Sequence, residues 1–509
     1  MKKLLFRMTM LAVLLCIGKT VLAQPKEKIV VAYVCSWTNE RLPDPTLMTH
    51  INYAFGHVKN TFDGVNIQNE PFLRKVVALR KQNPKLKIML SVGGWTSGNF
   101  SEMAATAKTR TAFAKDCKRI VDEYGLDGID IDWEYPTSNE AGISSSPDDT
   151  KNFTLLMRDL RKALGKKKLV TAATIADGLY IDFPACIKYM DFVNIMAYDV
   201  ANPPKHHTTL FRSSLSGRIT VEEAVNAHIR NGVPAEKLTL GMPLYGRGDH
   251  SNKVLDQYIK SGNTDGRYYE RWDEVGQVPY LVDKSGQLVW GFDNPRSLAA
   301  KCQLIIDRGL LGGMYWECTE DNAQLDEMRT IHLSLMKNGK ATIPQKRVLI
   351  LTDQRKGMAD NLGKFLAEKA RENNCEVRIL SPKDIKGDRP FDPYHVVVSD
   401  AKTLYQLTAE GKKAFEGFID EARGSFISLE DMTKDEKKDW EWYGQFCDDL
   451  RIAPIGEGMV TENGLPLNVL WNNTTKRGVN YHFIPSATAS NLKYAEQPLT
   501  TALCMALHE

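Results

Sequence analysis

The sequence contains few cysteines and no arrangement of them that would bind a metal. Nine cysteines are spread over 509 residues, with no Cys-x-x-Cys pair and no paired Cys/His spacing. This pattern argues against the usual zinc modules, so we expect neither a metal site nor a cofactor. A chain of this length can bury enough core to fold without disulfides, and scattered thiols then pack as small apolar side chains. Spacing alone identifies no cysteine pairing.

Long apolar runs are absent except for one at the amino terminus. Two lysines and an arginine within the first seven residues precede the run Met10–Ile17, and Val21-Leu22-Ala23 supplies small residues for cleavage. This order is typical of a secretory signal, so we predict a signal peptide over residues 1–23 and a secreted or periplasmic protein. Cys16 does not follow a small residue, which argues against a lipoprotein anchor. No second run is long enough to span a bilayer.

A strong charge of either sign is also missing. The chain has 66 Lys and Arg against 63 Asp and Glu, a formal net charge of +3. Loss of the four cations in residues 1–23 takes this value to −1. A near-neutral protein is a poor partner for nucleic acid or an anionic surface, so we expect no nucleic-acid binding. At 509 residues, two domains are the default expectation, and we expect the protein to act as a monomer.

One ten-residue run, Asp127–Pro136, carries the strongest functional signal in the chain. It reads Asp-Gly-Ile-Asp-Ile-Asp-Trp-Glu-Tyr-Pro, so Asp130, Asp132 and Glu134 alternate with apolar residues at the period of a β-strand. The three carboxylates would share one face at steps of about 6.6 Å, two residues' rise. Crowded carboxylates repel and are costly to bury, so stability alone does not favour this pattern. A solvated edge strand is the alternative, but the flanking Ile and Trp residues fit a buried strand better.

This run resembles the signature of glycoside hydrolase family 18, the chitinases and related N-acetylglucosaminidases. The family's strand-four pattern Asp-x-x-Asp-x-Asp-x-Glu is matched at Asp127, Asp130, Asp132 and Glu134 without departure. Further matches extend the resemblance over about residues 28–335. They are Ser-x-Gly-Gly at Ser91–Gly94, Met-x-Tyr-Asp at Met196–Asp199 and a last strand at Gly312–Trp316.

The order of apolar runs predicts an α/β protein whose first domain, residues 24–336, is a (β/α)8 TIM barrel. Eight β-rich runs alternate with mainly helical stretches, which implies parallel crossovers. The runs are 29–34, 50–55, 86–92, 127–134, 169–175, 192–198, 238–243 and 312–316. In such barrels the chemistry lies at the carboxyl ends of the strands. Polar or aromatic residues fall at nearly all of these ends: Trp37, Phe55, Trp95, Glu134, Tyr198, Tyr245 and Trp316.

The stretch 247–290, between the seventh and eighth strands, is longer than one crossover needs. It resembles a shortened form of the insertion that walls the substrate groove in many family members. A reduced wall predicts a shallower cleft and endo-type cutting.

Residues 337–345 hold Gly, Thr and Pro without an apolar period and predict a linker. Beyond it, residues 346–509 alternate strand-like and helical runs, which predicts a doubly wound α/β domain. Its layout resembles the trehalose-utilisation branch of the glutamine-amidotransferase-like fold. Cys375, Cys447 and Cys504 do not lie on a tight Gly-x-Cys-x-Gly turn, so we expect a non-catalytic accessory domain. Glycan binding and simple packing on the barrel are equal alternatives for its role.

The resemblance implies substrate-assisted, retaining hydrolysis, in which the 2-acetamido oxygen of the substrate attacks the anomeric carbon. Glu134 would protonate the leaving oxygen and later activate water. Asp132 would orient the acetamido group and stabilise its developing positive charge. Asp130 would lie behind Asp132 and share a proton with it, and Tyr198 would hydrogen-bond the acetamido oxygen.

Other residues are expected to bind the sugar. Sugar faces present C–H groups that pack on aromatic rings, although any one Trp has about an even chance of being core. By resemblance Trp316 would form the floor under the bound sugar. The remaining predicted binding residues are Met196, Asp199, Tyr245, Arg247, Trp95, Trp37, Tyr33 and Phe55.

These residues favour a secreted endochitinase acting on chitin or N-acetylglucosamine oligosaccharides. An endo-β-N-acetylglucosaminidase acting on the chitobiose core of N-glycans needs the same acetamido chemistry, so the site alone does not separate the two. A chitin-binding lectin that has lost hydrolysis is the alternative from another class. Such relatives usually replace the residue equivalent to Glu134, which is present here.

Overall fold

A computed structural model describes residues 28–38, 42–248, 267–352, 358–421, 424–428, 432–448, 451–452, 470–472, 481–483, 500, 502–504 and 506–507. The predicted signal peptide lies outside these residues. Within the described part of the chain, no helix combines the length and apolar character needed to cross a membrane.

Eight parallel strands close into a barrel, as predicted. The strand order is β1-β13-β8-β7-β6-β5-β4-β2, and β2 pairs back with β1. A short strand, β3 (Val65–Ile67), adds antiparallel to β2. The barrel strands are β1 (Ile29–Cys35), β2 (His50–Val58), β4 (Lys87–Gly93), β5 (Gly128–Asp132), β6 (Leu169–Ile175), β7 (Phe192–Met196), β8 (Leu238–Pro243) and β13 (Gly312–Trp316).

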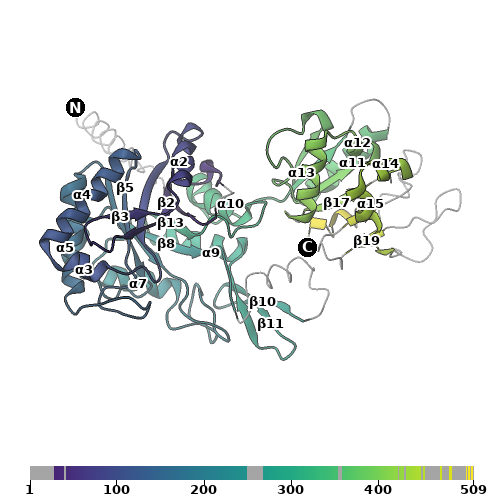
Figure 1. Cartoon of the computed structure of the whole chain (residues 1–509). Coiled ribbons are helices and arrows are strands. Elements are labelled where there is room, and N and C mark those ends of the chain that lie inside the picture. The colour runs from purple at the N-terminus through teal and green to yellow at the C-terminus, as the bar shows by residue number, and fades with distance from the viewer. Residues whose placement is uncertain are drawn as a thin grey trace, which may run out of the picture.

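Helices surround this barrel (Figure 1). Most follow a strand and bury one apolar stripe against the outside of the sheet, as α4 does with Phe113, Cys117 and Ile120. The helices are α2 (Glu70–Ala78), α3 (Phe100–Ala105), α4 (Ala107–Glu123), α5 (Asp149–Leu164), α6 (Phe183–Cys186), α7 (Val221–Arg230), α9 (Pro295–Asp307) and α10 (Asp326–His332).

The predicted insertion between the seventh and eighth barrel strands forms a small antiparallel sheet. Its strand order is β10-β11-β12-β9. The strands are β9 (Arg247–Gly248), β10 (Tyr269–Asp273), β11 (Val278–Val282) and β12 (Leu288–Gly291). Asn294 then caps α9 with Pro295 in its first turn, which returns the chain to the barrel.

The carboxyl-terminal part of the chain forms a second α/β unit. Its sheet has the order β15-β14-β16-β17-β20-β19-β18, with parallel pairing from β15 to β20 and antiparallel pairing of β19 with its neighbours. The strands are β14 (Arg347–Leu351), β15 (Glu376–Leu380), β16 (Val396–Ser399), β17 (Ser425–Ser428), β18 (Arg451–Ile452), β19 (Leu470–Asn472) and β20 (Tyr481–Phe483). The helices are α11 (Met358–Glu372), α12 (Ala401–Tyr405), α13 (Ala409–Asp420), α14 (Lys434–Asp439) and α15 (Glu441–Asp448).

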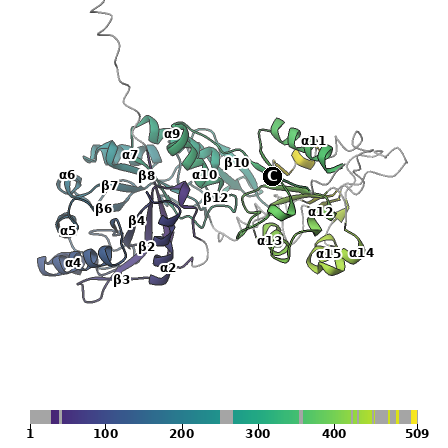
Figure 2. The same cartoon turned by 90° about the horizontal axis from the view of Figure 1, so that it is seen from above.

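Both faces of this second sheet are covered, as a doubly wound arrangement requires. Val348 and Ile350 of β14 pack with α11, whereas Leu349 and Leu351 pack with Phe415 of α13 and its neighbours. Figure 2 shows α11 on one side of the sheet and α12, α13 and α15 on the other. The predicted alternation of strands and helices is therefore present, and the amidotransferase-like resemblance stays a prediction.

The second unit contacts the connection between β13 and α10. The Gln324 amide donates to the Tyr394 carbonyl at 3.1 Å, Arg347 donates to the Gln324 carbonyl at 2.8 Å, and Asp326 lies 2.7 Å from His395 Nε2. The helical turns after α10 continue to Asn338, so the predicted linker begins two residues later than the sequence indicated.

Candidate active site

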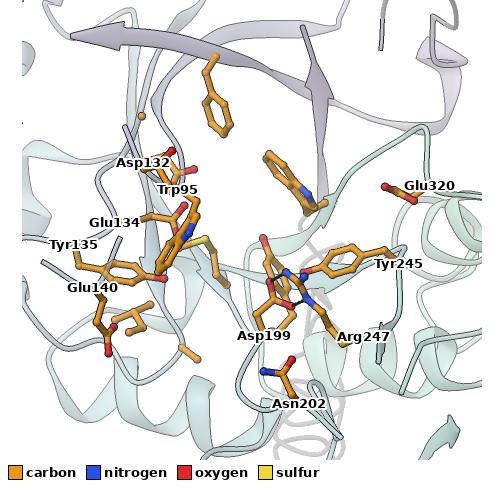
Figure 3. A pocket seen from close by; sticks show the side chains of 18 of the residues that line it. Trp95, Asp132, Glu134, Tyr135, Glu140, Asp199, Asn202, Tyr245, Arg247 and Glu320 are labelled. Atoms are coloured by element: carbon orange, nitrogen blue, oxygen red, sulfur yellow. Dashed lines mark hydrogen bonds and ion pairs between the residues drawn. The ribbon is translucent and has the colours of Figure 1, made fainter. Parts of the chain in front are cut away.

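A cleft of about 1000 Å³ opens at the carboxyl ends of the barrel strands (Figure 3). Eleven of the thirteen predicted site residues line it. They are Trp37, Phe55, Trp95, Asp132, Glu134, Met196, Tyr198, Asp199, Tyr245, Arg247 and Trp316. The other two, Asp130 and Tyr33, lie behind the wall, inside the barrel.

Asp130 is fully buried and accepts four hydrogen bonds. Tyr33 and Ser91 donate to one carboxylate oxygen at 2.7 and 2.8 Å. Thr171 and Asn194 donate to the other at 2.6 and 3.2 Å. Burial raises the pKa of Asp130, and these hydrogen bonds oppose the rise. These hydrogen bonds hold the Asp130 carboxyl group in place behind Asp132, and its charge raises the pKa of Asp132. The shared proton stays a prediction.

Asp132 is the last residue of β5, and its side chain reaches the cleft. It is 3% exposed, and its Oδ1 has no hydrogen-bond partner among the described residues. Burial, then the charges of Glu134 and Asp130, raise the pKa of Asp132 well above its ordinary value. The backbone of Gly93 and Gly94 lies directly against it: Gly94 N–H donates to the Asp132 carbonyl at 2.9 Å. A Cβ on Gly93, where φ is +134°, would lie 1.9 Å from that oxygen, which explains the predicted pair of glycines.

Glu134 lies two residues beyond the end of β5. The sequence pattern predicts it inside the strand instead. Its carboxyl group lines the cleft beside that of Asp132 (Figure 3). Burial raises the pKa of Glu134 to about 7, helped by the charge of Asp199 and opposed by a hydrogen bond from Tyr135. The charge of Glu134 also raises the pKa of Asp132, so the pair titrates as a unit and retains a proton near neutral pH.

The opposite wall of the cleft is built around an ion pair. Arg247 of β9 donates to both oxygens of Asp199, at 2.7 and 2.5 Å, and its guanidinium lies 5.1 Å from the Tyr245 ring. Burial raises the pKa of Asp199, but hydrogen bonds from Arg247 and His207 outweigh this and leave the pKa below its usual range. Figure 3 shows Asp199, Arg247 and Tyr245 facing Asp132 and Glu134 across the cleft.

Tyr198 lies close to charged groups on both walls of the cleft, Asp132 and Asp199. Burial, then the charges of Asp132 and Asp199, raise the pKa of Tyr198 well above its ordinary value, so its hydroxyl keeps its proton. Its ring contacts that of Tyr245 edge-on at 6.2 Å. Met196, the last residue of β7, also lines the cleft. A neutral hydroxyl beside two carboxyl groups can donate a hydrogen bond to a ligand.

Aromatic rings line the cleft in two groups. In one, Trp316 stacks on Phe55 at 5.6 Å, and Trp37 lies 6.3 Å from Trp316. In the other, Trp95 meets Tyr135 at 6.5 Å. Trp37 and Trp95 are each 56% exposed, so they face the cleft rather than the core. Large exposed indoles on a cleft are suited to the apolar faces of sugar rings.

Several lining residues were not predicted from the sequence. Apart from small and aliphatic groups, they are His57, Gln68, Thr96, Tyr135, Glu140, Asn202, Arg218 and Glu320. Tyr135 directly follows the carboxylate run and could have been found there. The others lie on connections whose course depends on tertiary packing, and their local sequence carries no comparable signal. Among the described residues, no group of three His, Cys, Asp or Glu side chains is placed to hold a metal ion.

Comparison with known proteins agrees with this geometry. Residues 29–321, more than half of the chain, match the glycosyl hydrolases family 18. The chain belongs to this family. It is 32% identical to chitotriosidase-1 of Mus musculus over 339 residues, which covers 56% of this chain and 72% of that protein. It is 29% identical to chitinase A1 of Niallia circulans, of which it spans 56%.

Solved structures give the same result for the fold. An N-acetylglucosaminidase of family 18 from Paenibacillus barengoltzii is 34% identical, with a TM-score of 0.55 over 60% of this chain and all of that chain. A chitinase from Rhizomucor miehei is 26% identical, with a TM-score of 0.54 over 60% of this chain and 99% of that chain. The family match ends at residue 321, before the second α/β unit.

Proposed function

We propose that this family 18 hydrolase cleaves β-1,4 bonds between N-acetylglucosamine units of chitin, with the substrate's own acetamido group as nucleophile. The observation that carries the proposal is the carboxyl pair Asp132–Glu134, buried at the floor of the cleft and still holding a proton near neutral pH. A carboxyl group with a pKa near 7 is suited to act first as acid and then as base. Relatives named chitinase or endochitinase support the choice of substrate.

In the first step Glu134 donates its proton to the glycosidic oxygen as the bond to the anomeric carbon breaks. The acetamido carbonyl oxygen forms a new bond to that carbon on the opposite face, which gives an oxazolinium ion. Asp132 would accept a hydrogen bond from the acetamido N–H and stabilise the positive charge. Tyr198, as a neutral donor, would hold the acetamido oxygen in line. The lack of a partner for Asp132 Oδ1 fits a group that is completed by ligand.

In the second step Glu134, now a carboxylate, takes a proton from water, whose oxygen attacks the anomeric carbon. The bond to the acetamido oxygen breaks, and the sugar leaves with its original configuration. The charge of Asp130, like that of Glu134, raises the pKa of Asp132 in the free enzyme, and it would stabilise positive charge near Asp132 during the reaction. The indoles of Trp37 and Trp95 would carry sugar units on either side of the cleaved bond.

Release of single N-acetylglucosamine units is a second candidate, favoured by 34% identity to an enzyme described as an N-acetylglucosaminidase. Action on the chitobiose core of N-glycans uses the same chemistry.

Digestion of the N-acetylglucosamine hexamer, followed by chromatography at early times, separates these modes. We expect dimers, trimers and tetramers first. Monomer as the sole early product would favour the second candidate, and cleavage of a glycoprotein but not of the hexamer would contradict chitin hydrolysis. The predicted signal peptide supports action outside the cytoplasm.

A further inference from the structure

Two adjacent buried histidines, His206 and His207, lie between the cleft and the insertion. Both are 1% exposed. His206 faces the insertion: its Nε2 lies 3.5 Å from Asp273, and its ring meets Tyr280 edge-on at 5.1 Å. His207 faces the cleft wall: its Nδ1 lies 3.3 Å from Asp199 Oδ1, and its ring lies 5.5 Å from that of Tyr245. Neither residue has a part in the reaction described above.

The surroundings of His207 determine which of its ring nitrogens carries the hydrogen. Asp199 is ionised and only accepts, so Nδ1 must be the protonated nitrogen if the two are hydrogen-bonded. Burial lowers the pKa of His207; Asp199 and Asp293 oppose this, and Lys301 adds to it. The imidazole is therefore neutral, with hydrogen on Nδ1. Its Nε2 is buried with no partner among the described residues. An apolar side chain would avoid that cost, so stability alone does not favour histidine here.

Asp199 is held differently by its two partners. Arg247 lines the cleft, and its side chain is 48% exposed. His207 is enclosed, packed against Tyr245 and adjacent to Thr208, whose hydroxyl accepts a hydrogen bond from the buried Lys301 at 2.8 Å. Lys301 in turn pairs with Asp293 at 2.5 Å. The hydrogen bond from His207 thus comes from an enclosed side chain next to a buried network, whereas that from Arg247 comes from a half-exposed one.

We infer that His207 is a positioning residue that fixes Asp199 against the cleft wall, at the location from which its charge acts on Glu134. The inference rests on the proposed function. Without the His207 hydrogen bond, Asp199 would turn toward Arg247 and the solvent-exposed side of the cleft. Burial raises the pKa of Glu134, the charge of Asp199 on the opposite wall raises it further, and a hydrogen bond from Tyr135 opposes the rise, while Asp132 on its own segment titrates together with it. Displacing Asp199 removes the charge that adds to burial in keeping Glu134 protonated.

The test compares His207→Leu, which removes the donor, with His207→Asn, whose amide N–H can replace Nδ1–H. For the hexamer we expect His207→Leu to lower kcat about three- to tenfold, the effect of one hydrogen bond, with KM within about twofold. The basic limb of the pH–rate profile of this variant should move to lower pH, because Glu134 loses its proton more readily. His207→Asn should restore both values toward wild type. His228→Leu removes another buried histidine, which lies on α7 and bonds Thr174 of β6 and the Ala224 carbonyl. It should lower stability without moving the basic limb.

If His207→Leu kept the basic limb of the pH–rate profile and the kcat of the wild type, the inference would be overturned. The same holds if His207→Asn had no higher kcat and no more alkaline limb than His207→Leu. A second measurement does not depend on activity. Nitrogen-15 NMR of the imidazole should show a neutral ring protonated at Nδ1, and a ring protonated at Nε2 would contradict the hydrogen bond. If the wild-type protein fails to cleave the hexamer, the proposed function fails, and the NMR result still decides the contact between His207 and Asp199.

Discussion

The two ends of β5 place the same kind of side chain in opposite electrostatic surroundings. Asp127, just before the strand, accepts a hydrogen bond from Ile88 N–H at 2.9 Å and pairs with Arg80 and with Lys87 at 3.2 Å. Burial raises the pKa of Asp127, but these partners outweigh it and lower the pKa. Asp132, at the other end, has two carboxyl neighbours instead, and its pKa is raised.

Within one sequence motif, Asp127 therefore contributes to stability and Asp132 to chemistry. At the amino end of the strand, cations and a backbone donor favour the charged carboxylate, so Asp127 stabilises the fold. At the carboxyl end, burial and like charges favour the protonated acid, which costs stability and makes proton transfer available. A (β/α)8 barrel keeps these tasks apart, because its active site lies only at the carboxyl face. Substitutions along the motif should therefore change either activity or stability.

The largest effect is expected for Glu134→Gln. The amide cannot donate or accept the transferred proton, so kcat for the hexamer should fall at least about a thousandfold, while oligosaccharide binding survives. Steady-state kinetics and calorimetric titration measure the two quantities. Glu236→Gln makes the same change just before β8, at the opposite face of the barrel, and should leave both unchanged. Unchanged turnover in Glu134→Gln would remove this residue from the mechanism.

Asp132→Asn should come next. Loss of the charge that stabilises the acetamido group should lower kcat at least about a hundredfold. The melting temperature should stay the same or rise, because one ionisable group is removed from a buried cluster of like charges. A loss in kcat of less than tenfold would contradict the proposed role.

Asp127→Asn is the matched substitution at the other end of the strand. We expect kcat within about twofold of wild type and a loss of about 1–2 kcal/mol in the free energy of unfolding at pH 7, since Asp127 is partly exposed and its ion pairs are screened. Because folding lowers the pKa of Asp127, its contribution is present above the ordinary aspartate pKa of about 4 and is lost as pH falls through the lower folded value. Urea unfolding of both proteins at pH 7 and pH 3 checks this. An equal loss at both values would mean that charge is not the cause.

The smallest effect concerns the pH dependence of stability at Glu134. Folding raises the pKa of Glu134 from about 4.3 to about 7, so the folded state binds the extra proton between these values. The free energy of unfolding of the wild type should therefore decline from pH 4.5 to pH 7 relative to Glu134→Gln. Thermal unfolding of the two proteins across this range measures the difference. A wild-type protein that gains stability over this range relative to the variant would contradict a raised pKa.

Much of the barrel could be predicted from the sequence, because eight apolar runs with helical spacers leave few other arrangements. Strand ends were less predictable. The alternation in 127–134 continues past Asp132, yet the backbone leaves the sheet there, and β7 likewise stops at Met196 before Tyr198. Side-chain period alone does not show where hydrogen bonding to neighbouring strands stops.

The candidate site also contains residues that could be predicted from the sequence and residues that could not. Residues in a dense motif, such as Glu134 and Tyr198, were predictable. The four donors to Asp130 were not predictable, because they come from four other strands, β1, β4, β6 and β7, and only the closed barrel brings them together. His207 gave no signal, because its importance depends on contacts with residues distant in the sequence. The second α/β unit was predictable as a fold, whereas its role is not determined by any motif.

The central claim is that the attacking atom comes from the substrate's acetamido group. The most direct measurement is proton NMR of fresh digests of two hexamers, one fully acetylated and one fully deacetylated. We expect the acetylated hexamer to release the β-anomer first and the deacetylated hexamer to remain uncleaved. Release of the α-anomer, or hydrolysis of the deacetylated hexamer at a comparable rate, would contradict it.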